Sequence, residues 1–120
     1  MREFRKLIVW QRAHALHIAI DEACQQVRQR RFANLKTQLS RAAESIPANI
    51  VEGCASDSKR DFARYLGVSI KSANETEYHL LAASERGALP SVDVNAFMSE
   101  TVEVRKMLYG LRKRLLSDDE

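Results

Sequence analysis

Few residues of this chain combine the type and the spacing that catalysis or metal binding requires. Glu75 and Glu77 are a close pair of acids, but residues two apart on a helix point about 200° apart, so their carboxylates do not converge on one cleft. His14 and His17 lie one helical turn apart, which in geometry suits a shared metal ion. However, no Glu-x-x-His pair of the di-iron bundle type accompanies them. We therefore interpret both histidines as packed or surface side chains.

The other common markers of chemistry are missing from the sequence. Cys24 and Cys54 lie far apart without a C-x-x-C pairing, so neither a zinc knuckle nor a redox motif is indicated, and buried thiols are the simpler interpretation. The sequence has no glycine-rich phosphate loop and no Gly-x-Ser-x-Gly elbow. We expect no enzymatic activity, no metal and no cofactor.

Positive charge is the feature that points most directly to a partner. The formal net charge is +3, and Lys and Arg gather in four clusters, at 2–12, 28–31, 59–64 and 105–114. The candidate nucleic-acid-binding residues are Arg28, Arg30, Arg31, Lys59, Arg60, Arg64, Arg112 and Lys113. Such clusters are more often a solvated helix face. Their repetition in an oligomer would add several weak phosphate contacts into one electrostatic surface.

A polar stripe runs beside an apolar one in the stretch 38–53, which reads Q-L-S-R-A-A-E-S-I-P-A-N-I-V-E-G. The apolar residues recur every three or four positions, as on one side of a helix. The polar stripe consists of Gln38, Arg41, Ser45, Asn49 and Glu52. Groups of these types suit hydrogen bonds across a helix–helix contact. An irregular helix with a few satisfied polar contacts is the alternative. Pro47 predicts a kink, because the apolar pattern continues past it.

Four helices would position these residues. The first runs from about Leu7 to about Gln29, and after a link at Phe32 and Ala33 the second is capped by Asn34. It ends near Gly53, a residue suited to the conformation past a helix C-terminus. The third helix opens with Ser58 and Asp61, which resemble a capping box, and closes at Gly87. Ser91 or Asp93 opens the last helix. Short connections predict an all-α, antiparallel up-down-up-down four-helix bundle.

The composition fits one soluble domain over residues 1–120, with a frayed tail at 117–120. Of the residues, 45% are hydrophobic and 29% charged, which is ordinary for a folded protein. No apolar run approaches the roughly 20 residues that span a bilayer, and no signal peptide is evident. We expect a cytoplasmic protein without membrane contact.

The first helix offers more apolar surface than one partner helix needs. Its main stripe extends from Val9 to Val27, and a second edge includes Trp10, His14 and His17. This second edge predicts another surface to cover, such as another subunit. Trp10, His14 and His17 are therefore the candidate oligomer interface.

The run R-A-A-E-S-I-P-A-N-I-V-E-G at 41–53 resembles the signature of the bacterial four helix bundle protein family, also called rRNA intervening-sequence proteins. Further segments that agree are F-R-K-L-I-V-W-Q-R-A-H at 4–14, D-F-A-R-Y-L at 61–66 and M-L-Y-G-L at 107–111. Val51 and Cys54 depart from the usual pattern. The resemblance implies that Glu75 and Glu77 occupy the family's Glu-x-Glu positions, where one acid would lock onto Arg41 or Asn49 of the second helix.

The resemblance also implies a homo-oligomer that forms a pentameric ring, and an association with nucleic acid through relatives that accompany reverse transcriptases in diversity-generating retroelements. Our first hypothesis is an oligomeric nucleic-acid or ribonucleoprotein accessory module, with RNA or DNA as the partner. A protein–protein adaptor without a nucleic-acid role is the alternative. A small catalytic bundle is a distant third hypothesis.

Overall fold

The computed structural model describes residues 2–117, which form four α-helices. The helices are α1 (Ile8–Gln25), α2 (Ala33–Cys54), α3 (Lys59–Glu85) and α4 (Ser91–Ser117). Two short 3₁₀ turns, η1 (Phe4–Lys6) and η2 (Arg30–Phe32), precede α1 and α2. None of the residues 2–117 lies in a β-strand. The prediction of an all-α chain with four helices is confirmed.

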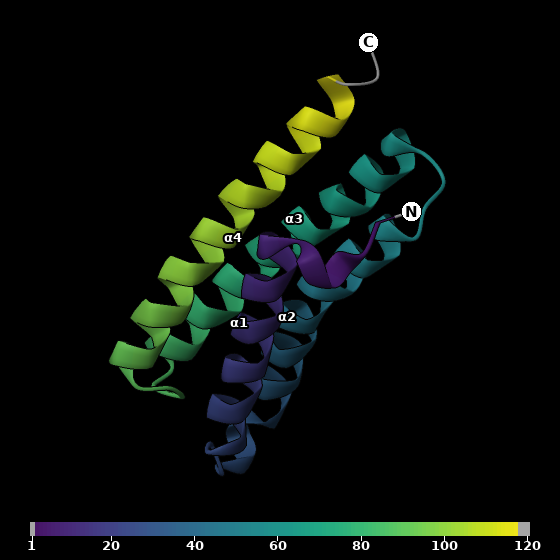
Figure 1. The fold of residues 1–120 in the computed structure, drawn as a ribbon. Helices are drawn as coiled ribbons and strands as arrows, with labels where there is room; N and C mark the ends of the chain where they lie inside the picture. The colour runs from purple at the N-terminus through teal and green to yellow at the C-terminus, as the bar shows by residue number, and fades with distance from the viewer. Residues whose placement is uncertain (1, 118–120) are drawn as a thin grey trace.

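The four helices form an antiparallel bundle (Figure 1). Along the chain α1 and α3 run in one direction, and α2 and α4 run in the other. Each helix packs against its neighbours in sequence, and α1 packs against α4 to complete the bundle. Within the described part of the chain, the diagonal pairs α1/α3 and α2/α4 make no comparable contact. The resulting rod measures 50 × 20 × 20 Å.

The core consists of two apolar clusters that succeed one another along the bundle. One includes Phe62, Leu66 and Leu108, and the other includes Phe32 and Leu80. Full burial of side chains of this size stabilises the fold by about 1.5–3 kcal/mol each. Where one cluster gives way to the other, α3 carries three buried hydroxyl residues, Ser69, Ser72 and Thr76.

The connection between α1 and α2 differs from the prediction. α1 ends at Gln25 rather than Gln29, and the cap position of α2 is Phe32, whose side chain makes no capping bond. Asn34 lies inside α2, so the predicted cap at Asn34 is wrong. The physical reason is burial: η2 folds the Phe32 side chain into the core, where it is fully buried.

The signals predicted around α3 are confirmed. Ser58 precedes the helix, and its Oγ accepts a hydrogen bond from the backbone N–H of Asp61 at 3.0 Å. Beyond the helix, Gly87 has a φ of +72°, the left-handed conformation that favours glycine. α4 then begins at Ser91, one of its two predicted starts.

α2 continues without interruption through Pro47. A proline in a helix interior removes one backbone donor and presses on the carbonyl four residues back. Pro47 is itself buried, so its ring contributes to the packing of α2. The predicted kink stays a prediction.

The predicted frayed tail lies mostly outside the described residues. Ser117 is still part of α4, and 118–120 are not described. Among the helices of residues 2–117, none is both long and apolar enough to cross a membrane.

Candidate nucleic-acid interface

The polar stripe of α2 does not act as one unit. Ser45 reaches α3, where its Oγ accepts a hydrogen bond from the Ser72 Oγ at 2.7 Å. Asn49 uses its Nδ2 within α2, donating to the Ser45 backbone oxygen at 2.9 Å and to the Ser45 Oγ at 3.0 Å. Asn49 therefore supports Ser45 instead of bridging to α3 itself. The other members diverge: Gln38 is half-buried, and Arg41 and Glu52 are exposed.

The buried hydroxyls of α3 complete the polar contact with α2. Ser69 Oγ donates to the Ile46 carbonyl at 2.9 Å, and Thr76 Oγ1 donates to the Ser72 carbonyl within α3 at 2.8 Å. The three α3 hydroxyl residues are at most 5% exposed. Because each has a partner, none contributes the cost of an unsatisfied buried donor. We interpret this layer as structural, since each of the three hydroxyl groups donates a hydrogen bond that joins α3 to α2 or lies within α3.

Glu77 forms an interhelical lock, but with α4 rather than α2. Its Oε1 accepts a hydrogen bond from the Arg105 Nη1 at 2.5 Å. Glu75 is exposed and points elsewhere, as the helical spacing of the two acids requires. The expected contact with Arg41 or Asn49 is therefore wrong. Of the two acids, it is Glu77 that ties α3 to α4.

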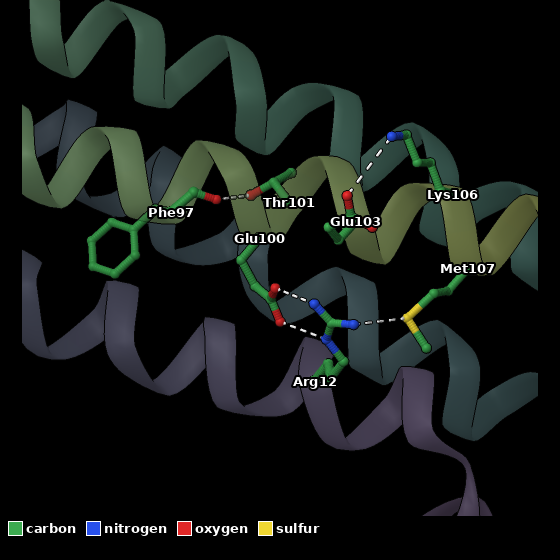
Figure 2. A network of polar contacts seen from close by, with 7 residues as sticks. All are labelled: Arg12, Phe97, Glu100, Thr101, Glu103, Lys106 and Met107. Carbon is green, nitrogen blue, oxygen red and sulfur yellow. Dashed lines mark hydrogen bonds and ion pairs between the residues drawn. The ribbon is translucent and has the colours of Figure 1, made fainter.

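A second interhelical ion pair joins α1 to α4 (Figure 2). The Nε and Nη2 of Arg12 donate to the two carboxylate oxygens of Glu100 at 2.9 and 2.5 Å, and the Nη1 contacts the Met107 sulfur at 3.6 Å. The hydrogen bond and charge of Glu100 raise the pKa of Arg12. The local sequence held no signal for this pair, because only the antiparallel alignment of α1 and α4 brings the residues together. The pair neutralises one cation of the N-terminal cluster.

The candidate oligomer interface on α1 forms a ladder of rings. Trp10 is half-buried, with Phe4 against its edge at 4.9 Å and His14 stacked on it at 4.8 Å with an interplanar angle of 8°. His17 follows, 6.4 Å from His14 between ring centroids. The structure thus brings the three predicted residues together. It also places part of the Trp10 surface against the chain's own core.

His17 lies beside α2, with its Nε2 3.9 Å from a carboxylate oxygen of Glu44. Its Nδ1 is buried and makes no hydrogen bond to the described protein atoms. Within residues 2–117, no group of three or more His, Cys, Asp or Glu side chains is arranged to hold a metal ion. Cys24 and Cys54 are buried free thiols, and burial raises the pKa of both.

The predicted cations divide between the two ends of the rod. Arg28, Arg30 and Arg31 lie in the α1–α2 connection, where the Arg31 guanidinium stacks on the Phe32 ring at 4.4 Å. Lys59 begins α3 at the other end of α2, a 22-residue helix and hence about 33 Å long. The eight residues therefore do not form one site in a single copy.

The remaining five cations gather where α3 begins and α4 ends. This α3/α4 basic surface consists of Lys59, Arg60, Arg64, Arg112 and Lys113. Arg112 leans from α4 onto α3: its Nη1 lies 3.5 Å from the point where Gly67 would carry a Cβ. Gly67 is one turn beyond Arg64 on α3. Cations from both helices thus lie at this end of the rod, with Arg112 beside α3.

Aromatic rings lie beneath two of these arginines. The Arg64 guanidinium is 4.4 Å from the Tyr65 ring centroid, and that of Arg112 is 5.0 Å from the Tyr109 centroid. Arg64 also pairs with Asp61 at 2.9 Å, so part of its charge is compensated. Tyr109 is 47% exposed, which leaves ring surface for another planar group. Arginine and tyrosine in this arrangement suit phosphate contact combined with base stacking.

Comparison with known proteins places the chain in a family. Residues 5–110 match the family model described as 23S rRNA-intervening sequence protein. The chain belongs to the 23S rRNA-intervening sequence protein family. A similar solved structure, with a TM-score of 0.83 and 25% identity, covers 88% of this chain and 99% of its own. It is a protein of unknown function from the S23 ribosomal protein family of Bacteroides thetaiotaomicron VPI-5482. A search of the curated proteins found no match.

Family membership confirms the resemblance inferred from the motif at 41–53. The matched range includes the ring ladder of α1 and the α3 part of the basic surface. It ends at residue 110, just before Arg112 and Lys113. In this 23S rRNA-intervening sequence protein, the two α4 cations of the basic surface therefore lie outside the family match. Their place in that surface is inferred from the structure alone.

Proposed function

We propose that this 23S rRNA-intervening sequence protein is a homo-oligomeric, non-enzymatic module that binds nucleic acid through the α3/α4 basic surface. The observation that supports this most is the position of Arg112, which lies over Gly67 and joins the cations of α4 to those of α3. The family description refers to an intervening sequence in 23S rRNA, which makes RNA the first nucleic acid to test.

The electrostatics of one copy favour weak, salt-dependent binding. Each phosphate contact releases counterions, so the logarithm of the association constant falls by about 0.7–0.9 per contact for each tenfold rise in salt. One copy offers at most five such contacts, and Arg64 already has an acidic partner. A pentameric ring, as the family resemblance implies, would repeat the surface and combine weak contacts into useful affinity.

Fluorescence anisotropy with labelled single-stranded RNA and duplex DNA, each at two salt concentrations, tests this proposal. We expect binding that weakens steeply with salt, and an affinity at least about tenfold lower for Arg112→Glu/Lys113→Glu, because two phosphate contacts become repulsive. The matched control is Arg28→Glu/Arg30→Glu, which makes the same charge change at exposed positions at the other end of the rod.

The outcomes separate the alternatives. A loss of binding confined to Arg28→Glu/Arg30→Glu would move the interface to the α1–α2 end. An absence of binding at both salt concentrations would contradict the nucleic-acid function. The protein–protein adaptor would then be favoured, for which an apolar groove between α1 and α4 is the supporting observation.

A further inference from the structure

A groove opens where α4 runs past the start of α1. Figure 1 shows the last turns of α4 extending beyond the first turn of α1. The segment before α1 leads away from α4, because the Arg2 backbone N–H donates to the Cys54 carbonyl at the end of α2 at 2.9 Å. The resulting groove between α1 and α4 has a volume of ≈ 580 Å³.

The floor of this groove is apolar. Leu7 contributes from just before α1, Ile8 from its first position, and Met107 and Leu111 from α4. Ile8 is 58% exposed, so its aliphatic surface is open to a partner in the groove. Gly110 keeps the groove open, since a Cβ added there would meet the Arg114 Nη1 at 3.8 Å and no closer neighbour. A groove with an apolar floor between two helices can receive the apolar face of an amphipathic helix.

The rim of the groove is cationic. Lys6, Lys106 and Arg114 line it, and no acidic residue among 2–117 does. Lys106 lies 3.7 Å from Glu103, but its side chain is 70% exposed, so that ion pair is weak. The field at the groove therefore favours a partner with negative charge.

We propose that this groove binds an acidic amphipathic helix of a partner protein. The apolar side of that helix would pack on Ile8 and Met107, and its carboxylates would face Lys6, Lys106 and Arg114. Such a helix would cover the part of α4 that α1 leaves uncovered, using the helix-in-groove mode of recognition. A nucleic-acid backbone satisfies the rim but not the apolar floor, so the observations favour a protein.

A pair of synthetic peptides provides the probe. One is an 18-residue helix with Leu at every third or fourth position and Glu beside each Leu, and the other has Lys in place of each Glu. By fluorescence anisotropy we expect the acidic peptide to bind the full-length protein and the basic peptide to bind at least about tenfold more weakly. Equal binding of the two peptides would overturn the proposal.

Variants locate the binding in the groove. Gly110→Leu fills the groove without a backbone clash, and Arg114→Glu reverses one charge on its rim. Each variant should lower the affinity for the acidic peptide at least about tenfold. Arg41→Glu makes the same charge change on the exposed face of α2 and should leave affinity unchanged. Far-UV circular dichroism should remain helical in all three variants. Peptide affinity that is unchanged in a folded Gly110→Leu protein would contradict the groove.

Two further measurements test whether a second copy of this chain occupies the groove, and whether the groove is distinct from the α3/α4 basic surface. If light scattering shows that Gly110→Leu lowers the oligomer mass without peptide, a second copy occupies the groove and the partner-helix proposal is wrong. Arg112→Glu/Lys113→Glu should keep peptide affinity, because neither residue lines the groove in the described structure. A loss of peptide affinity in that variant would overturn the separation of the two surfaces.

Discussion

Ser69 of α3 donates its hydroxyl hydrogen to the carbonyl of Ile46 in α2 at 2.9 Å, at the residue directly before Pro47. Pro47 has no N–H, so the carbonyl four residues earlier in α2 lacks its usual helical partner. The bond from Ser69 ties the same turn of α2 to α3. Ser69 is fully buried between the two helices, and because its side chain is small they can approach closely at this point.

Ser69→Ala should lower the free energy of unfolding by about 0.5–1.5 kcal/mol, the typical net contribution of one buried hydrogen bond. Urea denaturation followed by circular dichroism measures the change. Ser84→Ala, on an exposed position of the same helix, is the matched control and should have little effect. An unchanged midpoint for Ser69→Ala would mean that the bond adds nothing to the α2–α3 contact.

Leu108→Ala should destabilise the bundle by roughly 2–5 kcal/mol, because it leaves a cavity in a core that packs closely. Leu108 is fully buried in the cluster near the α2–α3 turn, whereas Leu116, on the same helix, is 46% exposed. Leu116→Ala is therefore the control for helix propensity and should cost far less. Similar losses for the two variants would show that the orientation of α4 is wrong.

The sequence predicted what local chemistry determines. Ser58 capped α3 as expected, because the donor and acceptor lie three residues apart. The partner of Glu77 was predicted on α2 but lies on α4, since the rotation of α3 about its axis selects which neighbour a side chain meets. The Arg12–Glu100 pair could not be predicted, because it depends on the alignment of α1 with α4.

For the candidate site too, the sequence predicted local features but not those that depend on how the helices pack. The sequence identified the cations, but it gave no basis for separating Arg28, Arg30 and Arg31 from the five residues at the far end of the rod. That separation depends on the antiparallel course of the helices. The approach of Arg112 to Gly67 depends in the same way on how α4 packs beside α3.

Stability should fall as the pH rises through the range in which the buried thiols titrate. Burial raises the pKa of Cys24, and the charge of Asp21 adds to the effect. Below the unfolded-state pKa of about 8.5, the thiol is protonated in both the folded and the unfolded state. In that range the thiol does not lower the free energy of unfolding. Above that pH the unfolded chain releases the proton first, so stability is lost until the folded thiol titrates as well. Denaturation midpoints between about pH 7 and 9.5 measure this decline.

Burial also raises the pKa of Cys54, so the variant that tests the effect removes both thiols. Cys24→Ala/Cys54→Ala should show a flatter dependence of stability on pH, even if its absolute stability is lower because of lost packing. The measured quantity is the slope of stability against pH. Lost packing lowers stability at every pH, so it does not change this slope. The same slope with and without the thiols would rule out their contribution.

The last prediction concerns assembly: we expect a closed homo-oligomer, in the simplest case five copies of the 13.7 kDa chain. A five-fold ring uses heterologous contacts, in which each copy presents different surfaces to its two neighbours. Trp10→Glu should reduce the oligomer, since Trp10 is the largest ring of the α1 ladder and is only half-buried within its own chain. Size exclusion with light scattering gives the mass.

Because Trp10 also packs on the core, Trp10→Glu could reduce the oligomer by unfolding the chain. A second variant therefore tests the interface at a residue outside the core. His14→Glu changes an exposed ring that stacks on Trp10 and should weaken assembly while far-UV circular dichroism remains helical. Ala15→Glu, exposed on the next position of α1, is a matched charge control. A mass of one subunit for the unmodified protein at all concentrations would contradict the oligomer. An oligomer that survives in both folded variants would place its interface away from the ladder, because a buried unpaired carboxylate is not tolerated in a packed contact.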